Sequence, residues 1–421
     1  MRILWLKSDL LVPLDKGGRL RTWHLLRHLA ARHEISYLAF TESGTPASSL
    51  RAMKDVADVV EPVTRDDAPK GSWKFAADAA VHLVDPLPYA VGKYRSREYA
   101  RRVRRLLAER AFDVVVCDFL CPIVNLPRRV PCPTVLFTHN VESEIWRRHA
   151  ETHTNPLMRM LYRQQYRRML RFERRSVARF DLVLAVSDAD RDTFARLYPG
   201  AIHRPVHVIP TGVDATYFTP SGPPSRPDGR SIVFTGSMDW LPNEDAMLFF
   251  CREVLPLVRA AEPEATLSIV GRAPTPAVQR LAAEQGVHVT GRVDDVRPYL
   301  EDATVFAVPL RIGGGTRLKI FEAMAMGKAV VSTSVGAEGL DVVPDVHVML
   351  ADDPRSFADT VVALFRDVER RRQIEQAGRA LVIDRYDWSA VAVSLEQALA
   401  SAVNQPAQDA VHAAWHPLEG R

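Results

Sequence analysis

The stretch 309–340 constrains the fold of this chain more than any other. It reads PLRIGGGTRLKIFEAMAMGKAVVSTSVGAEGL: an apolar strand, a glycine turn, a helix over Arg317–Met326, a glycine stop at Gly327 and a second apolar strand over Ala329–Ser332. Two strands joined through a helix are typical of a parallel sheet with helices on its faces. The stretch therefore predicts an α/β fold.

The turn in this stretch also has the chemistry of an anion site. Glycines at 313–315 let the backbone approach a ligand without interference from Cβ. Thr316 is a candidate N-cap, and the helix start directs free N–H groups toward an anion. Arg317 and Lys319 add two positive charges, and Glu322 is suited to accept hydrogen bonds from two hydroxyls. Phosphates at a helix start and a diol on a carboxylate describe a nucleoside diphosphate with its ribose.

A simpler interpretation of the same residues stays open. A glycine turn can merely join a strand to a helix, and the GxxxxGK[ST] spacing of a Walker loop is absent here. The arginine, lysine and glutamate that accompany the turn favour the ligand site over this structural interpretation.

Length and composition indicate a soluble protein of two domains. The 421 residues are 47% hydrophobic and 25% charged, and no run of eighteen apolar residues occurs. The N-terminus reads as a first strand rather than a signal peptide. The four cysteines form no CxxC pair and no metal-ligand spacing, so we expect a cytoplasmic protein with free thiols and no metal site.

The charge is distributed unequally between the two halves of the chain. Residues 1–210 contain 35 Lys and Arg against 23 Asp and Glu, while the chain as a whole carries a net charge of +4. The first half is therefore basic and the second acidic. This asymmetry suggests that one domain faces an anionic surface or substrate.

Strands alternate with helices in both halves of the chain, which predicts two Rossmann-like parallel-sheet domains. We expect a first domain over 1–215, a Pro- and Gly-rich linker over 216–230 and a second domain over 231–385. A crossover helix over 386–402 and a disordered tail over 403–421 would complete the chain. Within the domains, expected elements include a strand over 57–61 and helices over 74–83 and 244–260. Ligands of such sheets bind beyond the carboxyl ends of the strands.

Two further features mark the first half. Gly17 and Gly18 form a turn between a strand and a helix, a second possible anion or sugar contact. The helix 156–180 carries arginines along one side and apolar residues along the other. This helix is either an ordinary helix with a solvated arginine face or a surface attracted to anionic lipid headgroups. A third possibility is nucleic acid, but no nucleic-acid motif supports it, and we expect no nucleic-acid partner.

The chain resembles the retaining, nucleotide-sugar-dependent glycosyltransferases of family 4 (group 1). The resemblance rests on Gly17-Gly18 and on four longer strings: VIPTGVDATYFTP at 208–220, FTGSMDWLPNEDA at 234–246, VTGRVDDVRPYL at 289–300 and the stretch 309–340. These strings follow the family's order along nearly the whole chain. THNVE at 138–142 and the helix after Gly18 further resemble a subgroup that accompanies PEP-CTERM/exosortase exopolysaccharide loci.

The resemblance implies a GT-B fold: two Rossmann-like domains facing a central cleft, with a C-terminal helix that returns toward the first domain. Glu322 matches the second glutamate of the family's E-x7-E motif, which holds the ribose. The first glutamate is replaced by Gly314, so backbone groups of the turn would contact the donor instead. The contacts implied there come from Gly314, Gly315, Thr316 and Leu318.

Other family positions carry over with changes. Gly236 is kept, but Ser237 replaces the phosphate-binding arginine and no lysine follows, so Arg317 and Lys319 are candidates for the missing charge. Arg292 and Val293 would lie beside the base. His139 matches a histidine near the donor sugar, although a structural histidine at a strand end remains an alternative. The family's GT-B enzymes resembling this chain need no metal or other cofactor.

The implied reaction is transfer of a sugar from a nucleoside diphosphate sugar to a saccharide or lipid-linked acceptor with retention. It would serve exopolysaccharide or cell-envelope glycan synthesis. We expect the enzyme to be cytoplasmic, with peripheral association at the inner face of the membrane as an option that the arginine-rich helix leaves open. Catalytic roles fall to His139, Arg317 and Lys319. Two other functions remain open: a GT-B epimerase and a non-catalytic nucleotide-sugar-binding protein, the latter because the first glutamate is missing.

Overall fold

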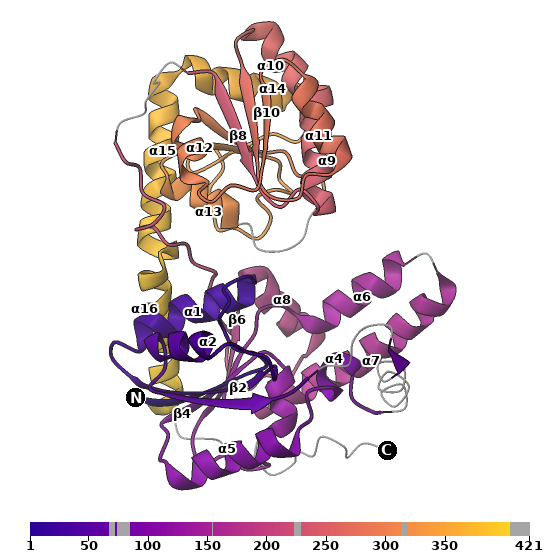
Figure 1. The fold of residues 1–421 in the computed structure, drawn as a ribbon, viewed down its shortest axis with the longest axis vertical. Helices are drawn as coiled ribbons and strands as arrows, with labels where there is room; N and C mark the ends of the chain where they lie inside the picture. The colour runs from indigo at the N-terminus through magenta and orange to yellow at the C-terminus, as the bar shows by residue number, and fades with distance from the viewer. Residues whose placement is uncertain (67–71, 74–84, 154, 223–228, 313–317, 405–421) are drawn as a thin grey trace. The chain divides into compact units, whose positions relative to one another are not determined.

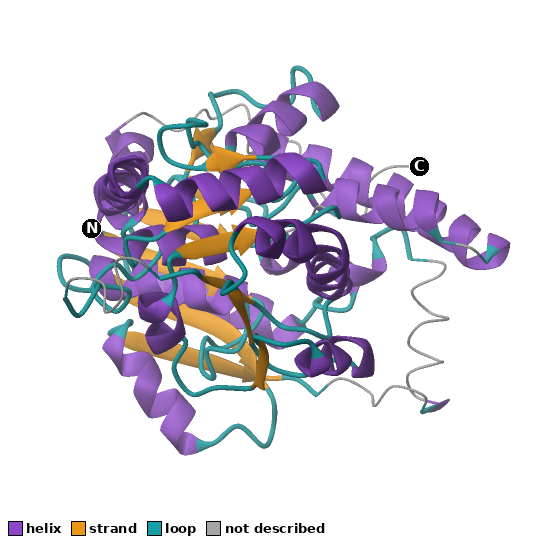
Figure 2. Ribbon diagram, turned by 90° about the horizontal axis from the view of Figure 1, so that it is seen from above, coloured by secondary structure: helices purple, strands orange, loops and turns teal. Residues whose placement is uncertain are grey.

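The computed structural model divides the chain into two compact units. It describes residues 1–404 except 67–71, 74–84, 154, 223–228 and 313–317 (Figure 1). The N-terminal unit comprises Met1–Pro210 together with the chain from Ala392 onward, and the C-terminal unit comprises Thr211–Val391. The expected tail and the helix expected over 74–83 fall largely outside the described residues. Each unit is a parallel sheet flanked by helices (Figure 2), which confirms the expected pair of Rossmann-like domains.

The sheet of the N-terminal unit has the strand order β3-β2-β1-β4-β5-β6-β7, and all its pairings are parallel. Its strands are β1 Arg2–Lys7, β2 Glu34–Thr41, β3 Val59–Thr64, β4 Val114–Asp118, β5 Thr134–Phe137, β6 Leu182–Ala185 and β7 His207–Val208. Its helices are α1 Gly17–Leu29, α2 Ala47–Ala52, α4 Tyr89–Gly92, α5 Arg97–Glu109, α6 Glu142–Thr152, α7 Pro156–Arg179 and α8 Asp188–Leu197, with 3-10 turns at Met53–Asp55 and Cys121–Asn125.

The strand expected over 57–61 begins later than predicted, because β3 starts at Val59. The apolar residues Val56 and Ala57 are buried, but they lie in the turn that precedes the strand. The predicted start was too early because these two residues are buried but do not pair with a neighbouring strand. Hydrophobicity alone cannot distinguish a buried turn from a strand.

The sheet of the C-terminal unit has the strand order β10-β9-β8-β11-β12-β13. Its strands are β8 Ser231–Thr235, β9 Thr266–Val270, β10 Val287–Gly291, β11 Val305–Val308, β12 Ala329–Ser332 and β13 Met349–Leu350. Its helices are α9 Leu241–Phe249, α10 Leu255–Ala261, α11 Pro276–Arg280, α12 Arg297–Asp302, α13 Leu318–Ala325, α14 Pro354–Arg366 and α15 Val368–Leu381, with a 3-10 turn at Leu281–Ala283 and a π-helical turn at Val382–Tyr386.

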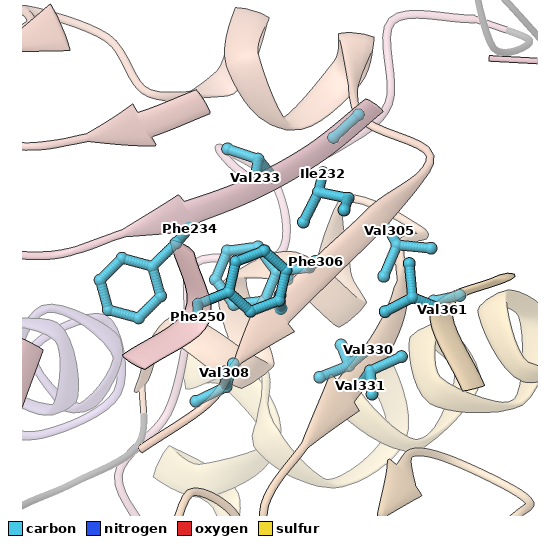
Figure 3. Packing of buried hydrophobic residues seen from close by; sticks show 14 of the residues in the cluster. Ile232, Val233, Phe234, Phe250, Val305, Phe306, Val308, Val330, Val331 and Val361 are labelled. Atoms are coloured by element: carbon cyan, nitrogen blue, oxygen red, sulfur yellow. The ribbon is translucent and has the colours of Figure 1, made fainter. Parts of the chain in front are cut away.

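The helix expected over 244–260 is interrupted. A π-helical turn at Phe250–Val254 separates α9 from α10, and Pro256 lies in the first turn of α10. Because proline has no backbone N–H, it cannot donate the hydrogen bond that would continue a regular α-helix through this point. Phe250 on this turn is fully buried in the core of the unit (Figure 3), where its ring lies 5.8 Å from that of Phe357.

The last helix, α16 Trp388–Asn404, contributes residues to both units. Its part from Ala392 onward belongs to the N-terminal unit, where Glu396 receives hydrogen bonds from Arg32 and pairs with His33 at 2.8 Å. The chain therefore returns to its first unit, as the expected crossover helix requires. No helix in the described part of the chain is long and apolar enough to cross a membrane.

The turns after β8 and β9 pack closely against each other at two glycines, Gly236 and Gly271. Gly271 has a φ of +151°, and a Cβ built on it would lie 1.7 Å from the carbonyl oxygen of Gly236. The conformation and the space both require glycine at position 271. The two turns are thus held against each other at the carboxyl end of the sheet.

We expect Gly271→Ala to destabilise the C-terminal unit by at least about 2 kcal/mol, because the new methyl group overlaps backbone atoms that cannot rotate away. Gly222→Ala is the matched control, since a Cβ there would meet no atom within 4 Å. Thermal unfolding measures both. Equal melting temperatures for the two variants would contradict the close approach of the turns.

Candidate active site

The strand order of the N-terminal unit reverses between β1 and β4, and a buried ion pair lies at the carboxyl ends of these two strands. Lys7 ends β1 and Asp118 ends β4. Lys7 Nζ lies 2.8 Å from Asp118 Oδ1, and the two side chains are 1% and 0% exposed. Such a switch point is where open parallel sheets bind ligands. Neither residue was among those predicted from the sequence.

The carboxylate of Asp118 accepts hydrogen bonds from four side chains. Besides Lys7, the donors are Trp5 Nε1 at 3.0 Å, Thr22 Oγ1 at 2.6 Å and His139 Nε2 at 2.7 Å. Four donors match the four lone-pair positions of a carboxylate. This set fixes the ends of β1, β4 and β5 and the first turns of α1 around one buried charge.

The surroundings set the charge states of Asp118 and His139. Burial would raise the pKa of Asp118, but the charge of Lys7 and the hydrogen bonds from His139 and Lys7 hold it well below its usual range. Burial lowers the pKa of His139 to about 3, which outweighs the attraction of Asp118. His139 is therefore neutral near pH 7, with its proton on Nε2 facing Asp118 and its Nδ1 left as an acceptor.

His139 is held between an aromatic ring and the start of α1. Its ring stacks on Phe119 with centroids 4.0 Å apart and planes 2° from parallel. Phe119 has a φ of +74°, a conformation that is rare for a residue with a side chain. A Cβ on Gly18 would lie 3.3 Å from the Phe119 ring and 3.7 Å from His139 Nδ1. The structure thus brings Gly18 and His139 together, whereas Gly17 is exposed with no atom near its Cβ position.

The C-terminal unit has its own switch point, between β8 and β11. Gly236 and Ser237 follow β8, and the stretch after β11 leads into α13. Lys319, in the first turn of α13, places its Nζ 2.9 Å from the Cβ position of Gly236. The same Nζ donates to Asn243 Oδ1 at 2.9 Å and lies 4.1 Å from the centre of the Phe234 ring. The structure therefore brings the predicted residues Lys319 and Gly236 close together.

Glu322 lies further along the same helix as Lys319. Its side chain is half-buried, and burial raises the pKa of its carboxyl to about 7 while Lys319 opposes the shift. A carboxyl group in this state can both accept and donate hydrogen bonds near neutral pH. Leu318 begins α13 and is half-buried.

The remaining predicted residues are placed differently. Arg292 is exposed in the loop after β10, and Val293 packs against the core; β10 is separated from β8 by β9. Gly314, Gly315, Thr316 and Arg317 lie outside the described residues. Among the residues the structure describes, no group of three or more His, Cys, Asp or Glu side chains could hold a metal ion.

Both halves of the chain match models of known families. Residues 16–217 match the model described as Glycosyltransferase Family 4, and residues 229–367 match the model described as Glycosyl transferases group 1. The chain has the two-domain GT-B fold. Similar solved structures of this fold include Anabaena Alr3699/HepE in complex with UDP, with a TM-score of 0.65 and 16% identity over 95% of this chain and 100% of that one. Sucrose-phosphate synthase of Thermosynechococcus elongatus has a TM-score of 0.64 and 16% identity, over 95% and 98% of the two chains.

Curated relatives match this chain over part of their length. An alpha-maltose-1-phosphate synthase of Mycolicibacterium smegmatis is 32% identical over 52% of this chain and 63% of that protein. A D-inositol 3-phosphate glycosyltransferase of Xylanimonas cellulosilytica is 31% identical over 55% and 60%. The chain thus spans less than two thirds of these relatives. An uncharacterized 44.6 kDa protein in the cps region of Klebsiella pneumoniae is 20% identical over 94% and 98%.

The network at Asp118 produces a testable pH dependence. Unfolded His139 takes up a proton below pH about 6.5, whereas the folded residue stays neutral down to about pH 3. The unfolded state therefore binds more protons in this window, and stability falls as the pH is lowered through it, by about 1.4 kcal/mol per pH unit.

We expect His139→Gln to remove this slope, because the Gln amide can still donate to Asp118 but does not titrate. Melting temperatures at pH 7, 6 and 5 measure the effect. As the pH falls, the melting temperature of the variant should rise steadily relative to that of the wild type. Parallel curves would mean that His139 is not held neutral.

Proposed function

We propose that this protein transfers a sugar from a nucleoside diphosphate sugar to a saccharide or lipid-linked saccharide acceptor, with retention of the anomeric configuration. We further propose that the reaction serves exopolysaccharide or cell-envelope glycan synthesis, as in the subgroup that accompanies exosortase loci. The observation that carries the proposal is the position of Lys319, whose ammonium group lies against the Gly236 turn at the switch point of the C-terminal unit.

The chemistry of α13 and the turn beside it suits a nucleotide. An ammonium group at a glycine turn attracts phosphate, and a carboxylate on the same helix, Glu322, suits the two hydroxyls of a ribose. The Anabaena protein of the same fold is known in complexes with UDP and with UDP-glucose. The name of the cps-region relative supports a role in the synthesis of surface polysaccharide.

The transfer step does not require a nucleophile from the protein. It requires that the leaving group be stabilised. As the bond to the sugar breaks, negative charge grows on the β-phosphate, and Lys319 would stabilise that charge where it forms. Asp118 is a poor nucleophile, because it is fully buried and its oxygens already accept four hydrogen bonds. These features favour front-face attack, in which the departing phosphate oxygen takes the acceptor proton. No cofactor beyond the donor takes part in this reaction.

His139 would act as a hydrogen-bond acceptor. With Nε2–H directed at Asp118, Nδ1 can receive a hydrogen bond from a sugar hydroxyl. Because the pKa of His139 is about 3, this role would hold throughout the physiological pH range. The proposed part of His139 is therefore to orient a sugar rather than to transfer a proton.

The acceptor side is proposed for the basic N-terminal unit. Helices α6 and α7 lie side by side and form a hairpin whose free end extends away from the rest of that unit (Figures 1 and 2). Arg163, Arg167 and Arg171 are exposed on α7, and Leu157 and Met160 near its start are 62% and 60% exposed. Arginines beside exposed apolar side chains suit the headgroups and acyl boundary of an anionic membrane. These residues support our proposal that the protein acts at the inner face of the membrane.

Nucleotide binding tests the proposal first. We expect one of UDP, GDP and ADP to raise the melting temperature, since a ligand that binds only the folded state stabilises it. Binding should tighten roughly fivefold or more from pH 6 to pH 8, because ionised Glu322 accepts from ribose hydroxyls and its pKa is about 7. Glu322→Gln should bind more weakly at pH 8 and show no such pH dependence.

Turnover with the matching nucleoside diphosphate sugar then separates the possible activities. A glycosidic product supports the transferase, and an α-linked product from an α-linked donor supports retention. Free epimerised sugar would favour an epimerase, and binding without turnover would favour a nucleotide-sugar-binding protein. A folded protein that binds no nucleoside diphosphate would overturn the proposal.

Vesicle flotation tests the membrane contact. Binding to vesicles that contain phosphatidylserine or phosphatidylglycerol should fall roughly 100-fold when Arg163, Arg167 and Arg171 are all replaced by Ala, at about 1 kcal/mol per arginine. High salt should also weaken binding of the wild-type protein. Arg252→Ala/Arg280→Ala/Arg355→Ala removes the same charge from exposed positions of the C-terminal unit and should change little. Flotation that is insensitive to salt and to the α7 substitutions would rule this surface out.

A further inference from the structure

The backbone of Arg272 is fixed against the turn that follows β8. Gly271 approaches Gly236 so closely that no side chain fits between them. In addition, the N–H of Met238 donates to the carbonyl of Arg272 at 2.9 Å, and the N–H of Gly236 donates to that of Val270 at 3.0 Å. These contacts hold the residue after β9 beside the turn after β8.

The side chain of Arg272 is directed onto this turn. Its Nε donates to Ser237 Oγ at 2.9 Å, and the side chain as a whole is exposed. The Ser237 hydroxyl in turn donates its single proton to Asp239 Oδ1 at 2.5 Å. Ser237 therefore has no proton left for a ligand, whereas the two terminal amino groups of Arg272 make no hydrogen bond with the residues that the structure describes.

Lys319 approaches the same turn from a different element. Its ammonium group lies beside Gly236, and its partner Asn243 donates through Nδ2 to the carbonyl of Ser237 at 2.8 Å. The guanidinium of Arg272, in the loop after β9, thus contacts Ser237, and the ammonium of Lys319, on α13, lies beside Gly236. Both cations are at the same turn. Two cations at the carboxyl end of a strand beside a switch point form a site for a dianionic ligand.

We propose that Arg272 binds the diphosphate of the nucleotide ligand and supplies the guanidinium that position 237 lacks. This inference rests on the proposed function and extends it by naming a residue that the sequence patterns did not indicate. Arg272 contacts the turn through Nε, so its two terminal amino groups are available as a planar pair of donors to phosphate oxygens. Lys319 supplies the second charge.

Isothermal titration with UDP, GDP and ADP, and with uridine, guanosine and adenosine, tests the assignment. Arg272→Ala should weaken the preferred nucleoside diphosphate about 10- to 100-fold, the range expected for a lost hydrogen bond to a charged group. Affinity for the matching nucleoside should stay unchanged, because the nucleoside has no phosphate. The dependence of binding on salt should also become shallower in the variant.

Two further variants separate binding from structural support. Ser237→Arg in the Arg272→Ala background places a guanidinium back on the turn and should restore most of the affinity. Arg280→Ala removes an exposed arginine from α11 and should bind like wild type. Circular dichroism and the ligand-free melting temperature establish that each variant is folded.

The outcomes distinguish the two proposals. If the wild-type protein binds no nucleoside diphosphate, the proposed function itself is overturned. Wild-type binding that Arg272→Ala leaves intact sinks only the role of Arg272. The assignment would also be overturned if Arg272→Ala lowered the affinity for the nucleoside and for the nucleoside diphosphate equally and Ser237→Arg restored neither. Arg272 would then only support the structure of the turn.

Discussion

The N-terminal unit depends on the neutralisation of one buried carboxylate. A charge without solvent is tolerated only when opposite charge and hydrogen bonds replace the lost water, and Asp118 obtains both from Lys7, Trp5, Thr22 and His139. These donors come from β1, α1 and the end of β5. The requirement to satisfy Asp118 therefore also fixes where His139 lies and which of its nitrogens carries the proton.

In the C-terminal unit, the positions of the charged side chains at the switch point depend on backbone packing and not on a buried ion pair. There the constraint is steric, since Gly271 and Gly236 bring two turns into backbone contact and the cationic side chains around them follow. Lys319 donates to an amide and lies over an aromatic ring, and Arg272 donates to a hydroxyl. Two cationic side chains from different elements therefore lie beside the same turn.

The sequence was sufficient to predict the architecture, and it identified only some of the residues that the structure brings together at the two switch points. The alternation of strands and helices indicated two parallel sheets, because that pattern is local and strongly periodic. Glu322 and Lys319 could be predicted as candidates because they lie on one helix that follows a glycine-rich stretch of sequence. Lys7, Asp118 and Arg272 were missed, because they become neighbours of the site only through the pairing of strands far apart in the sequence. Their one local signal was a polar residue at the end of an apolar strand, which is too common to single them out.

The C-terminal helix has a consequence for how the protein is made. Residues of α16 from Ala392 onward belong to the N-terminal unit, although the whole C-terminal unit is encoded before them. The contacts of Arg32 and His33 with Glu396 can therefore form only after the second unit has been synthesised, although all strands of the first sheet precede that unit. Completion of the first domain is thus coupled to translation of the second.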